Sequence, residues 1–158
     1  MTEIPMLRED LIALQKVISD EDVDLESLKY NKDSQLLSFD ALIGKQEDIR
    51  IETHDRRTLK VYPIIRRNIR FRNVVDLQSF FRKQQSGLFG VTVHQIDGET
   101  IEISGCGGKL IVTSSNPQIE VGPETETEYE WVERKLVFGI PYTKRRLRRK
   151  MASDGDMT

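Results

Sequence analysis

Apolar residues recur at helical spacing in two stretches of the chain. Near its start, leucine and isoleucine side chains follow one another at intervals of three or four residues, behind a proline that suits a first helical turn. In the middle, a second apolar face is formed by Leu77, Phe80 and Phe81, after an asparagine that can cap a helix and before a Ser-Gly pair that can end one. The two patterns predict helices over residues 5–19 and 74–85.

Elsewhere apolar and polar positions alternate, which is the period of a half-buried strand. This alternation predicts extended segments at residues 37–43, 49–53, 59–71, 88–93, 101–103, 110–113, 119–121 and 129–138. The pair Asp97-Gly98, between two of these segments, predicts a hairpin. Residues 20–34 are rich in acidic and small polar side chains, so they predict an acidic connector.

Together these elements predict an α+β fold that is mostly antiparallel β-sheet with two helices. The 158 residues suit one domain, and no internal repeat or Gly/Ser linker divides them. The single domain is expected over residues 1–143, with residues 1–34 supplying the N-terminal helix and the connector. Residues 144–158 are expected to form a basic, mobile tail.

The composition excludes several kinds of structural and metal-binding site. One cysteine and two histidines exclude an internal disulfide and a structural zinc cluster, and no metal or other cofactor is expected. No apolar run approaches the roughly 18 residues of a membrane helix, and the N-terminus lacks a basic region followed by an apolar stretch. We therefore expect no membrane partner and a location in the cytoplasm or in the interior of a virion.

The net charge of −2 conceals a strong segregation of charge along the chain. Residues 1–55 hold 6 basic and 14 acidic side chains, whereas residues 56–83 hold 9 and 1. Residues 84–143 have an acidic excess, with 3 basic and 9 acidic side chains. Residues 144–158 hold 6 basic and 2 acidic side chains. Two basic segments thus alternate with two acidic ones, and both basic segments are candidates for binding a polyanion.

The densest basic run lies where the predicted domain ends. Six of its seven residues are basic: Lys144, Arg145, Arg146, Arg148, Arg149 and Lys150. Such a run can displace condensed counterions from phosphates, which favours contact with nucleic acid. A solvated tail, or an intramolecular clasp on the acidic segments, explains the run equally well.

The second basic segment interleaves arginines with apolar residues. If residues 69–72 form a strand, Arg70 and Arg72 share one face and Ile69 and Phe71 the other, so a cationic surface backs onto a core. The four candidate contacts to a phosphate backbone are Arg66, Arg67, Arg70 and Arg72. In the alternative interpretation, these arginines pair with carboxylates on neighbouring strands.

Two catalytic hypotheses have less support in the sequence. Residues 131–135 resemble the apolar-apolar-Glu-x-Lys strand of metal-dependent nucleases, in which Glu133 would hold Mg²⁺ and Asp97 or Glu120 would supply the second carboxylate. Cys106 lies among small residues and could act as a nucleophile with a histidine as its base, or fill a tight turn as a small buried residue.

The sequence therefore favours a non-catalytic binding module that contacts nucleic acid or another polyanion through residues 56–83 and 144–150. The runner-up is a structural or assembly subunit of a virion or large complex, in which the acidic block of one copy meets the basic block of another. In that case the partners are proteins or further copies of the chain.

Overall fold

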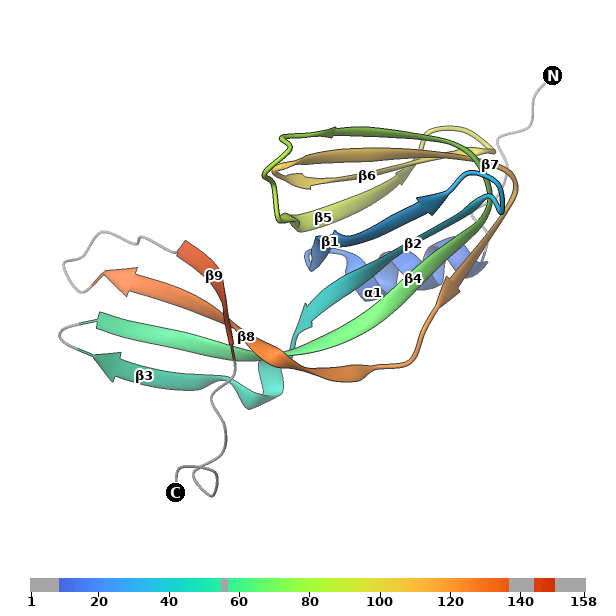
Figure 1. Cartoon of the computed structure of the whole chain (residues 1–158). Helices are drawn as coiled ribbons and strands as arrows, with labels where there is room; N and C mark the ends of the chain where they lie inside the picture. The colour runs from blue at the N-terminus through green and yellow to red at the C-terminus, as the bar shows by residue number, and fades with distance from the viewer. Residues whose placement is uncertain (1–8, 55–56, 137–143, 150–158) are drawn as a thin grey trace. The chain divides into compact units, whose positions relative to one another are not determined.

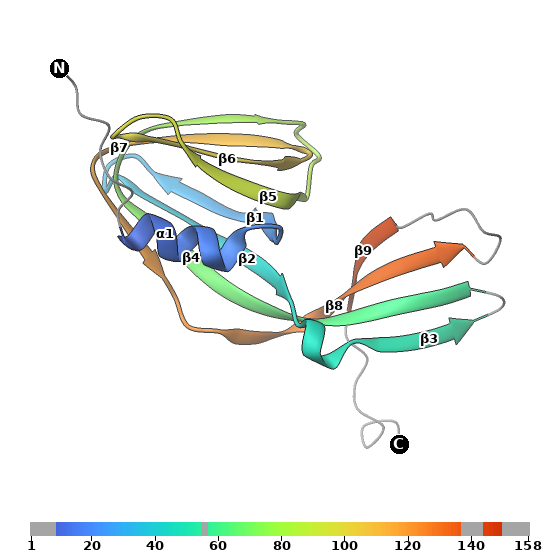
Figure 2. The same cartoon turned by 180° about the vertical axis from the view of Figure 1, so that it is seen from behind.

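The computed structural model describes residues 9–54, 57–136 and 144–149, and these form one α-helix and nine strands (Figures 1 and 2). The elements are α1 (Glu9–Ile18), β1 (Asp22–Asn31), β2 (Leu36–Gly44), the 3-10 turn η1 (Gln46–Asp48), β3 (Arg50–His54), β4 (Arg57–Phe81), β5 (Gly87–Gln95), β6 (Thr100–Cys106), β7 (Gly108–Val121), β8 (Thr125–Leu136) and β9 (Lys144–Arg149). Every strand pairing with a determined register is antiparallel.

Contacts divide the chain into two compact units. Unit 1 consists of Met1–Ile43 and Arg67–Glu124, and unit 2 of Gly44–Arg66 and Thr125–Thr158. The long strand β4 contributes residues 57–66 to unit 2 and residues 67–81 to unit 1.

In unit 1, six strands follow one another in the order β2-β1-β5-β6-β7-β4, and a further pairing between β2 and β4 closes the sheet into a ring. The closing contact includes a hydrogen bond of 2.9 Å from Val74 N–H to Gln35 O. The interior is filled by alternate side chains of these strands, among them Phe39 and Phe71, whose rings lie 5.9 Å apart. Burial of these apolar side chains supplies most of the driving force for folding of unit 1.

Helix α1 packs on unit 1 through Leu11, Leu14 and Ile18, which are buried at helical spacing. The carboxylate of Asp10 accepts a hydrogen bond from Ile119 N–H at 3.0 Å and so ties the first turn of the helix to β7. The helix predicted near the N-terminus is confirmed over residues 9–18, and residues 5–8 lie outside the described residues. No helix in the described ranges is long and apolar enough to cross a membrane.

The prediction of a second helix over residues 74–85, and with it the two-helix α+β fold, is wrong. Residues 74–81 continue β4 and pair with β7, where Leu77 lies opposite Val112. Leu77 and Phe81 pack on the core while Phe80 is 50% exposed, so alternate residues point inward as in a strand. The fold is a mostly antiparallel β-sheet with a single helix in the described residues.

A β-bulge explains why Asn73 resembled a helix cap. Asn73 has a φ of 63°, and the register between β4 and β7 shifts on either side of Val74. Asn116 on β7 also has a positive φ, 57°, and its carbonyl accepts a hydrogen bond of 2.9 Å from the Asn73 side chain. Asparagine tolerates this left-handed backbone, which is why it occurs at bulges as well as at caps.

The acidic connector predicted at residues 20–34 is also wrong, because most of it forms β1. β1 and β2 make a hairpin in which the Asn31 side chain accepts hydrogen bonds from Asp33 and Ser34 N–H. The expected strands at 37–43, 49–53 and 59–71 are confirmed, as is the hairpin at Asp97-Gly98, which joins β5 to β6. The two short strands expected at 110–113 and 119–121 belong to one strand, β7.

In unit 2, the strands β3, β4, β8 and β9 are paired in that order. The strand expected from residue 129 is confirmed within β8, while residues 137–138 lie outside the described residues. Where a basic tail was expected, Lys144–Arg149 form strand β9 and pair with β8; residues 150–158 lie outside the description. A small apolar cluster, Leu59, Val61 and Val132, lies at the middle of this sheet.

Candidate functional site

The arginines of β4 in unit 1 lie on the outer face of the closed sheet. Ile69 and Phe71 are fully buried, whereas Arg70 and Arg72 are exposed, so the predicted division of this strand into a cationic and an apolar face is confirmed. Phe71 fixes the strand by packing in the core, and this leaves the neighbouring guanidinium groups at the surface.

Arg72 is paired with a carboxylate on the neighbouring strand. Its Nε donates a hydrogen bond of 2.8 Å to Glu120 on β7. This hydrogen bond and the attraction between the charges raise the pKa of Arg72. They also lower the pKa of Glu120, with a further contribution from the charge of Arg70. The alternative interpretation, in which these arginines pair across strands, therefore applies to Arg72.

Arg70 is positioned by a neutral side chain. Its Nε donates to Asn68 Oδ1 at 3.0 Å, and the amide nitrogen of Asn68 donates to Asp40 Oδ1 at 3.0 Å. Arg70 also borders an open depression of about 260 Å³, lined by Asn68, Arg70, Glu120, Val121, Gly122 and Pro123. Among the arginines of β4 whose side chains the structure describes, Arg70 therefore has the best geometry for meeting a ligand from solution.

The other two predicted arginines have structural contacts. Arg67 is half-buried and donates from Nε to the carbonyl of Gly122 at 2.8 Å. Gly122 in turn donates from its N–H to Asn68 O at 2.7 Å, so Arg67 fastens the end of β7 to β4. Arg66 belongs to unit 2, is half-buried and has a polar interaction of its own.

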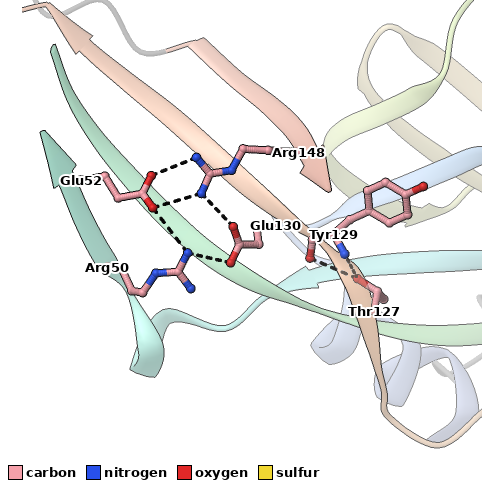
Figure 3. A network of polar contacts seen from close by, with 6 residues as sticks. All are labelled: Arg50, Glu52, Thr127, Tyr129, Glu130 and Arg148. Atoms are coloured by element: carbon pink, nitrogen blue, oxygen red, sulfur yellow. Dashed lines mark hydrogen bonds and ion pairs between the residues drawn. The ribbon is translucent and has the colours of Figure 1, made fainter. Parts of the chain in front are cut away.

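In unit 2, four charged residues form a network that extends over three strands (Figure 3). Glu130 of β8 is fully buried and lies between two guanidinium groups, 2.8 Å from Arg50 Nη2 and 2.9 Å from Arg148 Nη2. Arg148 of β9 also contacts Glu52 of β3, with Nη1 2.9 Å from Oε2. Arg50 Nη2 and Glu52 Oε1 are 3.7 Å apart and complete the network.

The strand register explains how these residues meet. Arg148 is directly opposite Glu130 in the β8–β9 pair, and Arg50 and Glu52 are two residues apart on β3, so their side chains share a face. β3 and β9 lie on either side of β4 and β8, so Arg148 and Glu52 meet over these two central strands. The network therefore links the two outer strands of unit 2.

The electrostatics of the network are balanced, because it holds two cations and two anions. The hydrogen bond that Arg148 donates to Glu52 is the main reason why the pKa of Arg148 is raised, and the hydrogen bond that it donates to Glu130 adds to this effect. Arg148, one of the ten residues predicted to contact a polyanion, is thus neutralised inside the fold. The pairing of β3, β4, β8 and β9 brings Arg50, Glu52 and Glu130 into the same network, and the sequence analysis missed all three.

The remaining predicted contacts lie on or beyond β9. The backbone of Lys144, Arg145, Arg146 and Arg149 belongs to this strand, whose described pairing is with β8 alone. The side chains of these four residues, and Lys150 as a whole, lie outside the described part of the chain. Their role in binding stays a prediction.

The described geometry gives the catalytic hypotheses little support. Glu120 is paired with Arg72, Asp97 accepts a hydrogen bond of 2.8 Å from Glu99 N–H in its turn, and the side chain of Glu133 lies outside the description. Within the described residues, no group of three His, Cys, Asp or Glu side chains could hold a metal ion.

Cys106 is exposed, so the expectation of a small buried residue is wrong. It occupies the tight β6–β7 turn between Gly105 and Gly108, which are paired. Cys106 pairs with Phe89 on β5. His94 is five residues further along β5, which places it roughly 16 Å from Phe89 and too far from Cys106 to act as its base. The second histidine, His54, belongs to unit 2, and its side chain lies outside the description.

Comparison of the chain with family models, with curated proteins and with solved structures found no match, so its function has to be inferred from these residues.

Proposed function

We propose that this protein is a non-catalytic binding module that contacts nucleic acid, or another polyanion, through residues 56–83 and 144–150. The observation that carries the proposal is the division of charge between the two units. Unit 2 holds 14 basic and 10 acidic residues, a net charge of +4, whereas unit 1 holds 10 and 16, a net charge of −6. A polyanion is attracted to a unit of positive net charge and repelled by one of negative net charge, so this division favours contact through unit 2.

Within unit 2, strand β9 concentrates the positive charge. Five of its six residues are basic, and they follow one another along an extended backbone at about 3.3 Å per residue. Because successive residues of a strand belong to opposite faces, cations that share a face recur about 6.6 Å apart, and such a row can follow a phosphate backbone without reading its sequence. Since Arg148 is already neutralised by Glu52 and Glu130, the contacts are expected from the other four basic residues of β9 and from Lys150.

Arg70 of unit 1 is the second expected contact. Its planar guanidinium lies at the surface beside the depression described above, and such a group can bind a phosphate or stack on a base. Arg72 contributes less because Glu120 offsets its charge. We expect the protein to act in the cytoplasm or in the interior of a virion.

The test is fluorescence anisotropy of labelled single- and double-stranded DNA and RNA across a salt series. The variant Arg145→Gln/Arg146→Gln/Arg149→Gln is compared with Lys16→Gln/Lys29→Gln/Lys32→Gln, which removes the same charge from exposed positions of unit 1. The β9 variant should lower the slope of log K against log salt by about 2 to 3 units, and the control should leave it unchanged. Equal slopes for both variants and the wild type would refute a contact through β9.

The opposite net charges of the two units also favour a second candidate function, assembly of copies in which unit 1 of one meets unit 2 of another. Contacts of this kind weaken as salt screens them. Light scattering at low and at high salt would therefore show large particles only at low salt, with or without nucleic acid.

A further inference from the structure

Strand β3 forms one border of the sheet in unit 2. In the described part of the chain it pairs only with β4, from Arg50 opposite Val61 to His54 opposite Arg57. Ile51, in this strand, is 67% exposed, and Ile49 just before it is 37% exposed. A strand at the border of a sheet has backbone groups that can pair with another strand, and exposed isoleucines beside them favour such pairing.

The opposite border, β9, is protected against its own copy. Its five basic residues would face one another if two copies paired there, and like charges in neighbouring strands repel. β3 differs because Arg50 and Glu52 carry opposite charges. The two borders therefore differ in whether they allow a second copy to approach.

We propose that two copies of this protein pair antiparallel through β3, with Ile51 at the two-fold axis. In that register, Ile51 lies opposite Ile51 of the second copy, and Arg50 lies opposite Glu52 of the second copy. The same register repeats by symmetry, so both oppositely charged pairs form at once. The side chain of Arg50 is 46% exposed and that of Glu52 is 29% exposed, so the part of each that its own network leaves open can approach the opposite charge of the second copy.

The contact is short because β3 has only five residues. It therefore predicts a dimer that depends on concentration, as expected of small interfaces. Apolar burial of Ile51 and backbone hydrogen bonds do not weaken with salt in the way that charge pairs do. Persistence of the dimer at high salt distinguishes it from the assembly through opposite charges considered above.

The register is tested by cross-linking the full chain in a Cys106→Ser background with oxidised glutathione as the oxidant. Directly opposite residues of an antiparallel pair have Cα atoms about 4.5 to 5.5 Å apart, which fits a disulfide. Ile51→Cys should therefore form a disulfide-linked dimer. Thr53→Cys is the matched control, because in this register the two copies of residue 53 lie four residues apart, at roughly 13 Å.

The second measurement is the mass of the wild type by light scattering, in high salt and over a concentration series. A mass that rises from one chain to two is expected, and Ile51→Lys should return it to one. Ile96→Lys, at another exposed isoleucine on a turn of unit 1, should leave the dimer intact. A wild type that stays monomeric at every concentration, growth beyond two chains, or cross-linking of residue 53 in place of residue 51 would each overturn the proposal.

Discussion

Arg148 donates from Nη2 to the buried carboxylate of Glu130 at 2.9 Å, directly across the β8–β9 pair. The same guanidinium holds Glu52 on the other outer strand of unit 2. Because a buried carboxylate without a partner is costly, Glu130 depends on the two arginines that neutralise its charge. The network therefore adds side-chain contacts to the backbone pairing that holds β9 in the sheet.

Removing the charge of Glu130 should destabilise the protein. Glu130→Gln removes the negative charge that two guanidinium groups share, and breaking a buried ion pair costs about 3 to 5 kcal/mol. Arg50 is 46% exposed and can recover some hydration, so we expect about 2 to 3 kcal/mol of unfolding free energy to be lost. Urea unfolding measures this, with Glu47→Gln, an exposed glutamate of η1, as the control. A loss no larger than that of the control would contradict the structural role of the network.

Replacing Arg148 by lysine tests the geometry of the network separately from its charge. Lysine keeps the positive charge, but a single ammonium cannot hold Glu52 and Glu130 with the fork of a guanidinium. Arg148→Lys should therefore lower the unfolding free energy, and Arg148→Met should lower it further because the buried carboxylate then loses that charge as well. Equal stability of Arg148→Lys and the wild type would show that charge alone is sufficient.

The glycines of unit 1 offer a matched test of a close backbone approach. A Cβ atom added at Gly108, whose φ is +146°, would collide with the carbonyl oxygen of Phe80 on the neighbouring strand. At Gly90, whose φ is +60°, the added atom would meet nothing within 4 Å. Gly108→Ala should cost more than about 2 kcal/mol, from overlap and backbone strain together, and Gly90→Ala about 1 kcal/mol from strain alone. Similar midpoints in thermal unfolding would contradict the pairing of β4 with β7 at this position.

The ion pair of Arg72 with Glu120 predicts a small dependence of stability on pH. Because the folded state lowers the pKa of Glu120, the pair stabilises the protein above the unfolded pKa of about 4.3 and is lost as pH falls through the lower folded value. NMR titration of the Glu120 carboxyl should show this lowered pKa. Both groups are exposed, so 1 M salt should return the pKa toward its usual value, and a pKa unaffected by salt would contradict a surface pair.

Local patterns were sufficient to predict the strands in which apolar residues are buried and the polar residues between them are exposed. The segment Ile69-Arg70-Phe71-Arg72 is an example, because inward and outward residues can be separated by period alone. The same reasoning failed at residues 74–85, where Leu77, Phe80 and Phe81 also fit a helical face. There the pairing of β4 with β7 decided the structure, and a propensity that is only local cannot reveal it.

The network of unit 2 could not be predicted because its members are distant in sequence. Glu52 and Arg148 are 96 residues apart, and they meet only once β3, β4, β8 and β9 have paired in order. Charge segregation along the chain did indicate that oppositely charged residues would pair, but it could not identify the partners. For the same reason, the exposure of Ile51 becomes informative only when β3 is known to border the sheet.

Glu120 should restrain binding of a polyanion by Arg72, and removing its charge tests this. In Glu120→Gln the guanidinium of Arg72 loses the partner 2.8 Å away and can contact a phosphate instead, so affinity should increase and the salt slope should become steeper by up to about 0.9. Glu99→Gln is the control, because it changes the net charge equally at an exposed turn. Anisotropy of labelled single-stranded RNA and DNA measures both variants. If the two variants gain equally, the increase reflects net charge alone, and Arg72 has no part in the site.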